Sequence, residues 1–68
     1  MKTVSGKHLA RLAEARGWVF RRVKGSHHVY EKPGRTETLS IPLHGNKDLK
    51  IGLQSALMKL IGLKSSDL

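Results

Sequence analysis

The sequence predicts a small α+β domain in which a helix, three strands and a second helix follow one another. Apolar residues recur at helical spacing near both ends of the chain, and three short segments between them are rich in β-branched and aromatic residues. Because so small an antiparallel sheet is unstable alone, both helices are expected to cover one of its faces. With 68 residues and no cysteine, residues 1–68 are expected to form a single domain without disulfides.

The first helix is expected to begin after an N-cap at Thr3 or Ser5 and to end at Gly17. Either hydroxyl can accept a hydrogen bond from a free backbone N–H of the first turn. The apolar residues at helical spacing that would form the buried side are Val4, Leu9, Leu12 and Ala13.

Residues 18–24, 28–32 and 37–42 are predicted to be strands of an antiparallel meander. Gly25 and Ser26 form a turn signal between the first two, and residues 33–35, which include Pro and Gly, form the second turn.

The last helix is expected to run from an N-cap at Asp48 to a stop at Gly62. Its predicted buried stripe comprises Leu49, Leu53, Ala56, Leu57 and Leu60. Three further apolar residues are expected on the flanks of this stripe, namely Ile51, Met58 and Ile61. Residues 64–68 are expected to be a short flexible tail. This order of elements, with both helices on one face, matches the architecture of double-stranded-RNA-binding domains.

The charge indicates a nucleic-acid partner. The formal net charge is +8, and the 13 Lys and Arg residues are spread along the chain and form no tail. A membrane surface is a weaker expectation, because neither predicted helix has a bulky aromatic face and no segment is long enough to cross a bilayer. A soluble cytoplasmic domain is therefore expected.

The turn Gly25-Ser26-His27-His28 is the strongest candidate for chemistry. Histidine exchanges a proton near neutral pH, and RNA carries its own nucleophile in the ribose 2′-hydroxyl, so a histidine among cations could support RNA cleavage. The alternative is that this turn is polar surface without a catalytic role. No metal site is expected, because His27 and His28 would point to opposite faces of the strand.

Two basic groups could contact phosphate. One is the strand cluster Arg21, Arg22 and Lys24 near the histidine pair, and the other is the loop with His44 and Lys47. Either group could instead be solvated surface. The single aromatic residues Trp18 and Tyr30 could stack on bases, but they are expected to belong to the core of so small a domain.

Nearly the whole chain, from Val4 to Leu63, resembles the HicA toxins of bacterial and archaeal toxin–antitoxin modules. The stretches that carry the resemblance are Leu9 and Leu12 followed by Gly17-Trp18, Val23-Lys24-Gly25-Ser26-His27-His28, Pro42 with His44, Lys47-Asp48-Leu49-Lys50-Ile51-Gly52, and Gly62-Leu63. The chain departs from the family pattern at Leu53-Gln54, where many relatives have a polar residue and then an apolar one. This departure concerns the packing of the last helix.

The resemblance implies an mRNA interferase, which is an endoribonuclease that cuts mRNA without a metal or other cofactor, and an inhibitory partner, the HicB antitoxin. It also implies that the catalytic residues are His28 and His27, with His28 favoured as the principal base over His27, and Gly25 and Ser26 as supports. The expected RNA contacts are Gly25, Ser26, Lys24, Arg22, Arg21, His44 and Lys47. A monomer alone and a hetero-oligomer with the antitoxin are expected.

Two other functions stay open at this point. The chain could be a double-stranded-RNA-binding module without catalysis, because its charge and predicted fold alone favour binding by shape and phosphate. It could also be an inactive toxin relative that persists as half of a complex. The intact Gly25-Ser26-His27-His28 turn argues against the last alternative.

Overall fold

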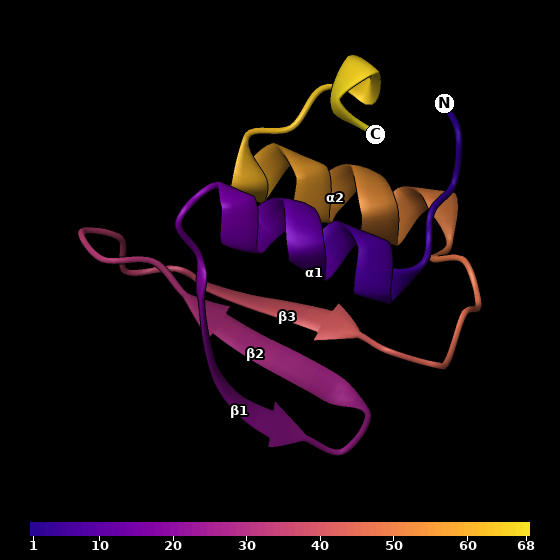
Figure 1. Cartoon of the computed structure of the whole chain (residues 1–68). Helices are drawn as coiled ribbons and strands as arrows, with labels where there is room; N and C mark the ends of the chain where they lie inside the picture. Colours follow the sequence, from indigo (N-terminus) through magenta and orange to yellow (C-terminus); the bar gives the residue numbers. More distant parts are fainter.

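The computed structural model describes all 68 residues and has the predicted fold class. In chain order, its elements are α1 (Gly6–Ala15), β1 (Val19–Lys24), β2 (His27–Glu31), β3 (Thr38–Pro42), α2 (Ile51–Ile61) and the 3₁₀ helix η1 (Ser65–Asp67). The strands form an antiparallel sheet in the order β1-β2-β3, and both helices lie on one face of it (Figure 1). The helices pack over β3, while β1 forms the edge of the sheet farthest from them.

A β-bulge at Arg21 decides which side chains of β1 face the helices. Phe20 is paired with Tyr30 and Arg22 with Val29, so Arg21 has no partner across the ladder. Side chains alternate along a regular strand, and one extra residue reverses the alternation beyond it. The face toward the helices, which we call the helix-side face, therefore carries Phe20, Val23, His28, Tyr30, Leu39 and Ile41. The opposite, outer face carries Val19, Arg22, Lys24, His27, Val29 and Ser40.

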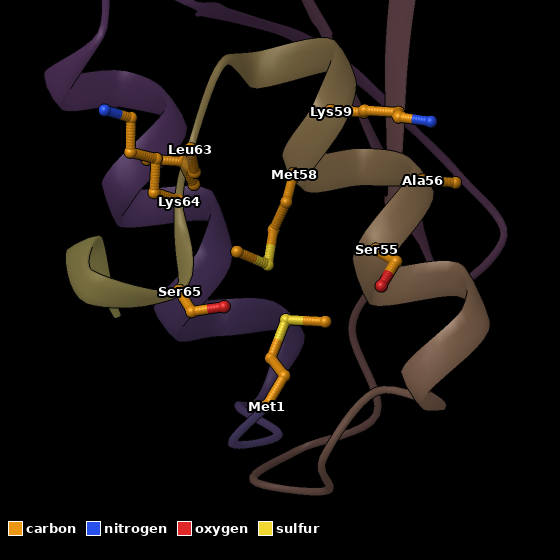
Figure 2. A pocket seen from close by; sticks show the side chains of 8 residues that line it. All are labelled: Met1, Ser55, Ala56, Met58, Lys59, Leu63, Lys64 and Ser65. Carbon is orange, nitrogen blue, oxygen red and sulfur yellow. The ribbon is translucent and has the colours of Figure 1, made fainter.

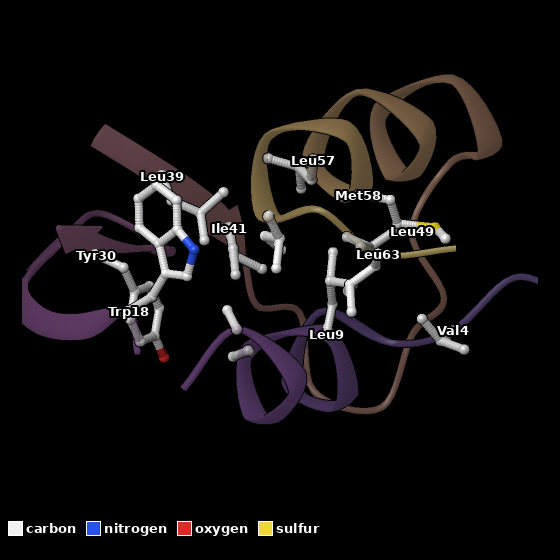
Figure 3. Close-up of a cluster of buried hydrophobic side chains, with 13 residues drawn as sticks. Val4, Leu9, Trp18, Tyr30, Leu39, Ile41, Leu49, Leu57, Met58 and Leu63 are labelled. Carbon is white, nitrogen blue, oxygen red and sulfur yellow. The ribbon is translucent and has the colours of Figure 1, made fainter. Parts of the chain in front are cut away.

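The core lies between this helix-side face and the two helices (Figure 3). Leu9 of α1, Leu39 and Ile41 of β3 and Trp18 are its largest fully buried apolar side chains. Trp18 and Tyr30 both belong to the core, as predicted. The guanidinium of Arg35 lies 5.5 Å from the Trp18 ring centroid and so covers the exposed end of the core.

Ser5 is the N-cap of α1, because its side-chain oxygen accepts a hydrogen bond from the His8 N–H at 3.1 Å. The other candidate, Thr3, instead donates its hydroxyl to the Asp48 carboxylate at 2.8 Å. At Gly6 the first turn of α1 meets the end of β3 so closely that a Cβ there would overlap the Pro42 carbonyl oxygen. Glycine is therefore required at this position for steric reasons.

The start of the last helix and part of its buried side were predicted wrongly, although Leu49, Leu57, Met58 and Ile61 are buried. α2 is capped by Lys50 without a side-chain hydrogen bond, because the Asp48 carboxylate is engaged by Thr3 before the helix begins. The buried residues of α2 are Gln54, Leu57, Met58 and Ile61. Leu53 and Ala56 are exposed, so the stripe is displaced by one residue, or about 100° around the helix axis. Gly62 follows α2 in the left-handed conformation, as predicted.

Residues 64–68, expected to be a tail, form η1 and contact α1 in this structure. The Lys64 N–H donates to the Asp67 carboxylate at 2.7 Å, and Asp67 also forms an ion pair with Arg16 at 3.3 Å. The His8 imidazole Nε2 lies 3.3 Å from the Leu68 carbonyl oxygen. No helix is long and apolar enough to cross a membrane.

Candidate functional site

Three segments that are distant in sequence meet at one end of the domain: the first turn of α1, the β1–β2 turn and the loop between β3 and α2 (Figure 1). The Leu43 N–H donates to the Ser26 carbonyl at 2.9 Å, which ties this loop to the β1–β2 turn. The close approach of Gly6 to Pro42 brings the start of α1 to the same place. The cations and histidines gathered there are Lys7, Lys24, Lys47, Lys50, His27, His28 and His44, and we call this region the basic end.

The positive charge of the basic end is not neutralised within the chain. The four lysines there make no ion pair, and its one acidic residue, Asp48, accepts a hydrogen bond from Thr3. The three ion pairs of the domain lie toward its other end: Arg16 with Asp67, Arg21 with Glu31, and Arg35 with Glu37. Hydrogen bonding to Arg35 lowers the pKa of Glu37, so this carboxylate stays charged. The basic end therefore carries positive charge that no ion pair neutralises.

His28 is half-buried on the helix-side face of β2. It is paired with Val23 on one neighbouring strand and with Ile41 on the other. Its imidazole centroid lies 5.2 Å from that of Phe20, with the two rings tilted by 51°. The ring therefore lies between the closed core at Ile41 and the open edge of the sheet at β1, where a large ligand can reach it.

His27 lies on the outer face and is exposed. Its Nδ1 is 3.2 Å from the Ser40 hydroxyl oxygen, and with Ser40 it borders a shallow hollow of about 490 Å³. The other residues that line this hollow are Lys24, Gly25 and Ser26. The strand alternation thus separates the two histidines as predicted, and a ligand on one face contacts only one of the imidazoles directly.

The strand cluster predicted near the histidine pair lies with His27 and not with His28. Lys24 is paired directly with His27, and Arg22 also points to the outer face. Arg21 is the bulge residue, and its guanidinium donates to the Glu31 carboxylate at 3.1 Å. Of the three, Arg22 and Lys24 are thus left free to bind phosphate.

The β1–β2 turn presents its backbone openly between the two faces. Gly25 has a φ of 62°, and no atom lies within 4 Å of the position that a Cβ would take. This left-handed conformation favours glycine, and it leaves room for a bulky anion to approach the backbone. Ser26 is exposed beside it.

His44 and Lys47 border a second hollow in the basic end, with a volume of about 250 Å³. Lys50 also lines this hollow, and Asp48 is the one acid there. The structure thus brings the two residues predicted in this loop together with a third cation, in a hollow that His28 does not line.

A stripe of charged residues on α1 runs along the open side of the sheet. His8 contacts the Leu68 carbonyl, so one flank of α1 faces the C-terminal segment. Glu14 lies on the other side of the buried residues of α1, and burial together with the Glu14 carboxylate raises the pKa of Tyr30 in β2. Lys7 and Arg11 share this side with Glu14, because residues three, four and seven apart lie along one helix face. Since Gly6 adjoins Pro42 and His28 is paired with Ile41, Lys7 is at the end of this stripe toward His28.

The protein-family comparison agrees with the order of these elements. The family model described as HicA toxin of bacterial toxin–antitoxin systems matches residues 6–63, which include every helix and strand up to the end of α2. The chain belongs to the HicA toxin family. Its role is therefore that of the toxin in a toxin–antitoxin system, and its partner is an antitoxin. No curated protein matched the chain in a direct comparison.

The largest hollow of this HicA toxin is elsewhere. It has a volume of about 620 Å³ and lies between α2 and the two chain ends, where Figure 2 shows the side chains of Met1 and Met58 directed into it. None of the residues predicted for the site lines it. The volume of a hollow alone would therefore not identify the histidines as the candidate site.

Sequence reasoning missed four residues of this HicA toxin that lie around the predicted ones. Lys50 borders the hollow of His44, and Lys7 lies on α1 toward His28. Phe20 and Val23 flank His28 from β1. Lys50 could have been found as a further cation next to the predicted loop, whereas Lys7 comes close only through the packing of α1 on β3. Phe20 could not, because regular alternation places it on the face opposite Val23 and only the bulge brings them together.

Proposed function

We propose that this HicA toxin is an endoribonuclease that cuts mRNA without a metal ion, with His28 as the general base. The observation that carries the proposal is the position of His28. Its imidazole packs beside Phe20 and its residue is paired with the buried Ile41, yet it adjoins an open sheet edge and an uncompensated basic end. The proposal also rests on the family, whose members the chain resembles in the Gly25-Ser26-His27-His28 turn.

In the proposed reaction, a neutral His28 imidazole nitrogen takes the proton of a ribose 2′-hydroxyl. The 2′-oxygen then attacks the adjacent phosphorus, and the bond from phosphorus to the 5′-oxygen of the next nucleotide breaks. The products are a 2′,3′-cyclic phosphate and a 5′-hydroxyl, whose oxygen takes up one proton. No water molecule is consumed in this step, so the atoms balance without a co-reactant.

The basic end would contribute positioning and charge. Lysines there stabilise the additional negative charge of the phosphorane-like transition state and neutralise the flanking phosphates. Lys7 is placed for the first role by its side of α1. The open backbone at Gly25 and the cations Arg22, Lys24 and Lys47 suit the second, together with Ser26 and His44.

The antitoxin of the HicB type is proposed to bind the same region. A folded antitoxin that presents acidic groups would neutralise the basic end and cover His28. Opposite charges on the two proteins would also speed their association. The toxin alone would be a monomer, and the inhibited form would be a hetero-oligomer.

The test is cleavage of a labelled mRNA transcript by the purified toxin in EDTA, beside the variants His28→Ala and His27→Ala. We expect the wild type to cut in the chelator, and His28→Ala to lose at least a hundredfold in rate, in line with the usual contribution of a general base of about 10²–10⁴. His27→Ala, which changes the outer face, is expected to lose much less. Circular dichroism checks that both variants remain folded.

Two results would contradict the proposal. Full cleavage by His28→Ala would remove that residue from the reaction. No cleavage by the wild type, with salt-dependent RNA binding retained, would instead favour the double-stranded-RNA-binding module.

A further inference from the structure

The edge strand β1 leaves an apolar surface uncovered beside His28. Phe20 and Val23 lie on the helix-side face, yet they are 43% and 55% exposed because the helices pack over β3 and not over β1. Exposing a phenylalanine to water costs free energy that burial would recover. A side chain of this kind next to a candidate catalytic group requires an explanation.

We propose that Phe20, with Val23 beside it, is a nucleobase-binding site that stacks on a base of single-stranded RNA and holds that nucleotide next to His28. This inference rests on the proposed function and specifies its substrate class. An unpaired base is needed, because the faces of paired bases are covered by their neighbours in a duplex.

The geometry fits a stacking platform. The Phe20 ring is held from the side by two other rings, with centroids 5.2 Å away at His28 and 5.8 Å away at Tyr30. Both contacts are tilted or edge-on, at 51° and 67°, so neither neighbour covers the Phe20 ring by parallel stacking. A base stacked there would have its own ribose and phosphate close to the imidazole.

The bulge at Arg21 creates this arrangement. Without the extra residue, Phe20 and Val23 would point to opposite faces of β1, and only one of them could stand beside His28. Bulges commonly redirect side chains next to active sites. The same bulge turns Arg22 and Lys24 to the outer face, so the surface around Phe20 is apolar while its surroundings are cationic.

The surrounding positive charge fits RNA as the occupant. Lys7 and Arg11 lie on the flank of α1 opposite the one that contacts the C-terminal segment, where they can bind the phosphates on either side of a stacked base. Aromatic stacking combined with a cationic groove is the usual way in which proteins bind single strands without strong sequence preference.

The test uses single-stranded RNAs that carry 2-aminopurine, whose fluorescence is quenched when the base stacks, with the fluorescent base moved along the strand. All proteins carry His28→Ala, so the RNA stays intact. We expect strong quenching, and a loss of about tenfold to a hundredfold in affinity when Phe20→Ala is added, which is the usual effect of removing one stacking residue. Phe20→Trp should restore quenching and affinity, and Phe20→Leu should restore neither.

The matched control is Val19→Ala, because Val19 is 41% exposed on the outer face of the same strand. It should leave RNA affinity unchanged. Thermal unfolding of the variants separates a folding defect from a binding defect, since Phe20→Leu keeps the apolar packing and removes only the aromatic face.

The proposal is overturned if Phe20→Ala quenches like its parent, or if Phe20→Leu restores binding as well as Phe20→Trp does. It is also overturned if the Phe20 variants keep RNA affinity but lose antitoxin binding, which would make the surface a protein interface. Cleavage is measured separately on proteins with His28 intact. Quenching without any wild-type cleavage would refute the ribonuclease and leave the base-binding site standing.

Discussion

Gln54 is the only polar side chain that is fully buried in the domain. Its side-chain oxygen accepts a hydrogen bond from the Val4 N–H at 2.8 Å, and its amide nitrogen donates to the Lys2 carbonyl at 2.7 Å. These bonds fasten the N-terminal segment to α2. They also provide hydrogen-bond partners for a polar side chain in the core.

Replacing Gln54 with leucine should therefore destabilise the fold, although leucine is more hydrophobic. The buried Val4 N–H would lose its acceptor, and an unsatisfied buried donor costs about 1–3 kcal/mol. Urea unfolding measures the difference, with Ser55→Ala, an exposed neighbour on α2, as the control expected to have little effect. A Gln54→Leu protein as stable as the wild type would show that the N-terminal segment does not need this contact.

For single residues, sequence patterns predicted positions in the fold better than they predicted side-chain contacts. The alternation of strand residues was enough to place His27 and His28 on opposite faces. The small size of the domain was enough to place its single aromatic residues Trp18 and Tyr30 in the core. The role of Gln54 was hidden, because its partners are backbone groups 50 and 52 residues away. Such contacts depend on tertiary packing and leave no local signal.

The two helices are fixed by different means, and their glycines make the difference measurable. Gly6 begins α1 against the Pro42 carbonyl, whereas Gly52 lies in the first turn of α2 with no atom near the position of a Cβ. Replacing glycine with alanine at the two helix starts should therefore have opposite effects on the free energy of unfolding.

We expect Gly6→Ala to lower the free energy of unfolding by about 1–3 kcal/mol, because the methyl group forces α1 away from β3. Gly52→Ala should raise it by roughly 0.4–1 kcal/mol, since alanine lowers the entropy of the unfolded chain without a clash. Chemical denaturation of both variants tests this. Equal effects of the same sign would refute the close contact at Gly6.

The existence, order and type of the two α-helices and three strands were predictable, whereas η1 was not, and the strand bounds differ by at most one residue. Periodicity placed Leu57 correctly in the core but chose the wrong neighbours, because several apolar residues on both sides of α2 fit a stripe equally well. The N-terminal segment at Gln54 decides between them. The bulge at Arg21 was likewise invisible, since nothing in residues 18–24 distinguishes it from regular strand.

Across the whole molecule, ion pairs and unpaired cations are distributed unevenly between the two ends. The ion pairs lie toward one end, and unpaired lysines with three of the four histidines lie at the other. The net charge of +8 alone indicated a nucleic-acid partner but could not show where it binds, because cations are spread evenly along the sequence. Folding brings the predicted turn and the predicted loop to one end, together with the first turn of α1, and separates Arg21 from them.

This polarity predicts which lysines control the salt dependence of RNA binding. On the His28→Ala background, Lys24→Ala and Lys47→Ala should each reduce the slope of log affinity against log salt by about 0.7, the value for one phosphate contact on a single strand. Lys59→Ala and Lys64→Ala, which change the hollow at α2 and the chain ends, should leave it unchanged. Equal effects of all four would mean that charge acts without a defined site.

The proposed role of His28 as the base that activates the 2′-hydroxyl is best tested by the chemistry of the RNA ends that the wild-type toxin produces in EDTA. If His28 activates the 2′-hydroxyl, mass spectrometry should find 2′,3′-cyclic phosphate or its hydrolysis product on one fragment and a 5′-hydroxyl on the other, and His28→Ala should produce neither. Fragments with 3′-hydroxyl and 5′-phosphate ends would show that water is the nucleophile, and the mechanism given for His28 would be wrong.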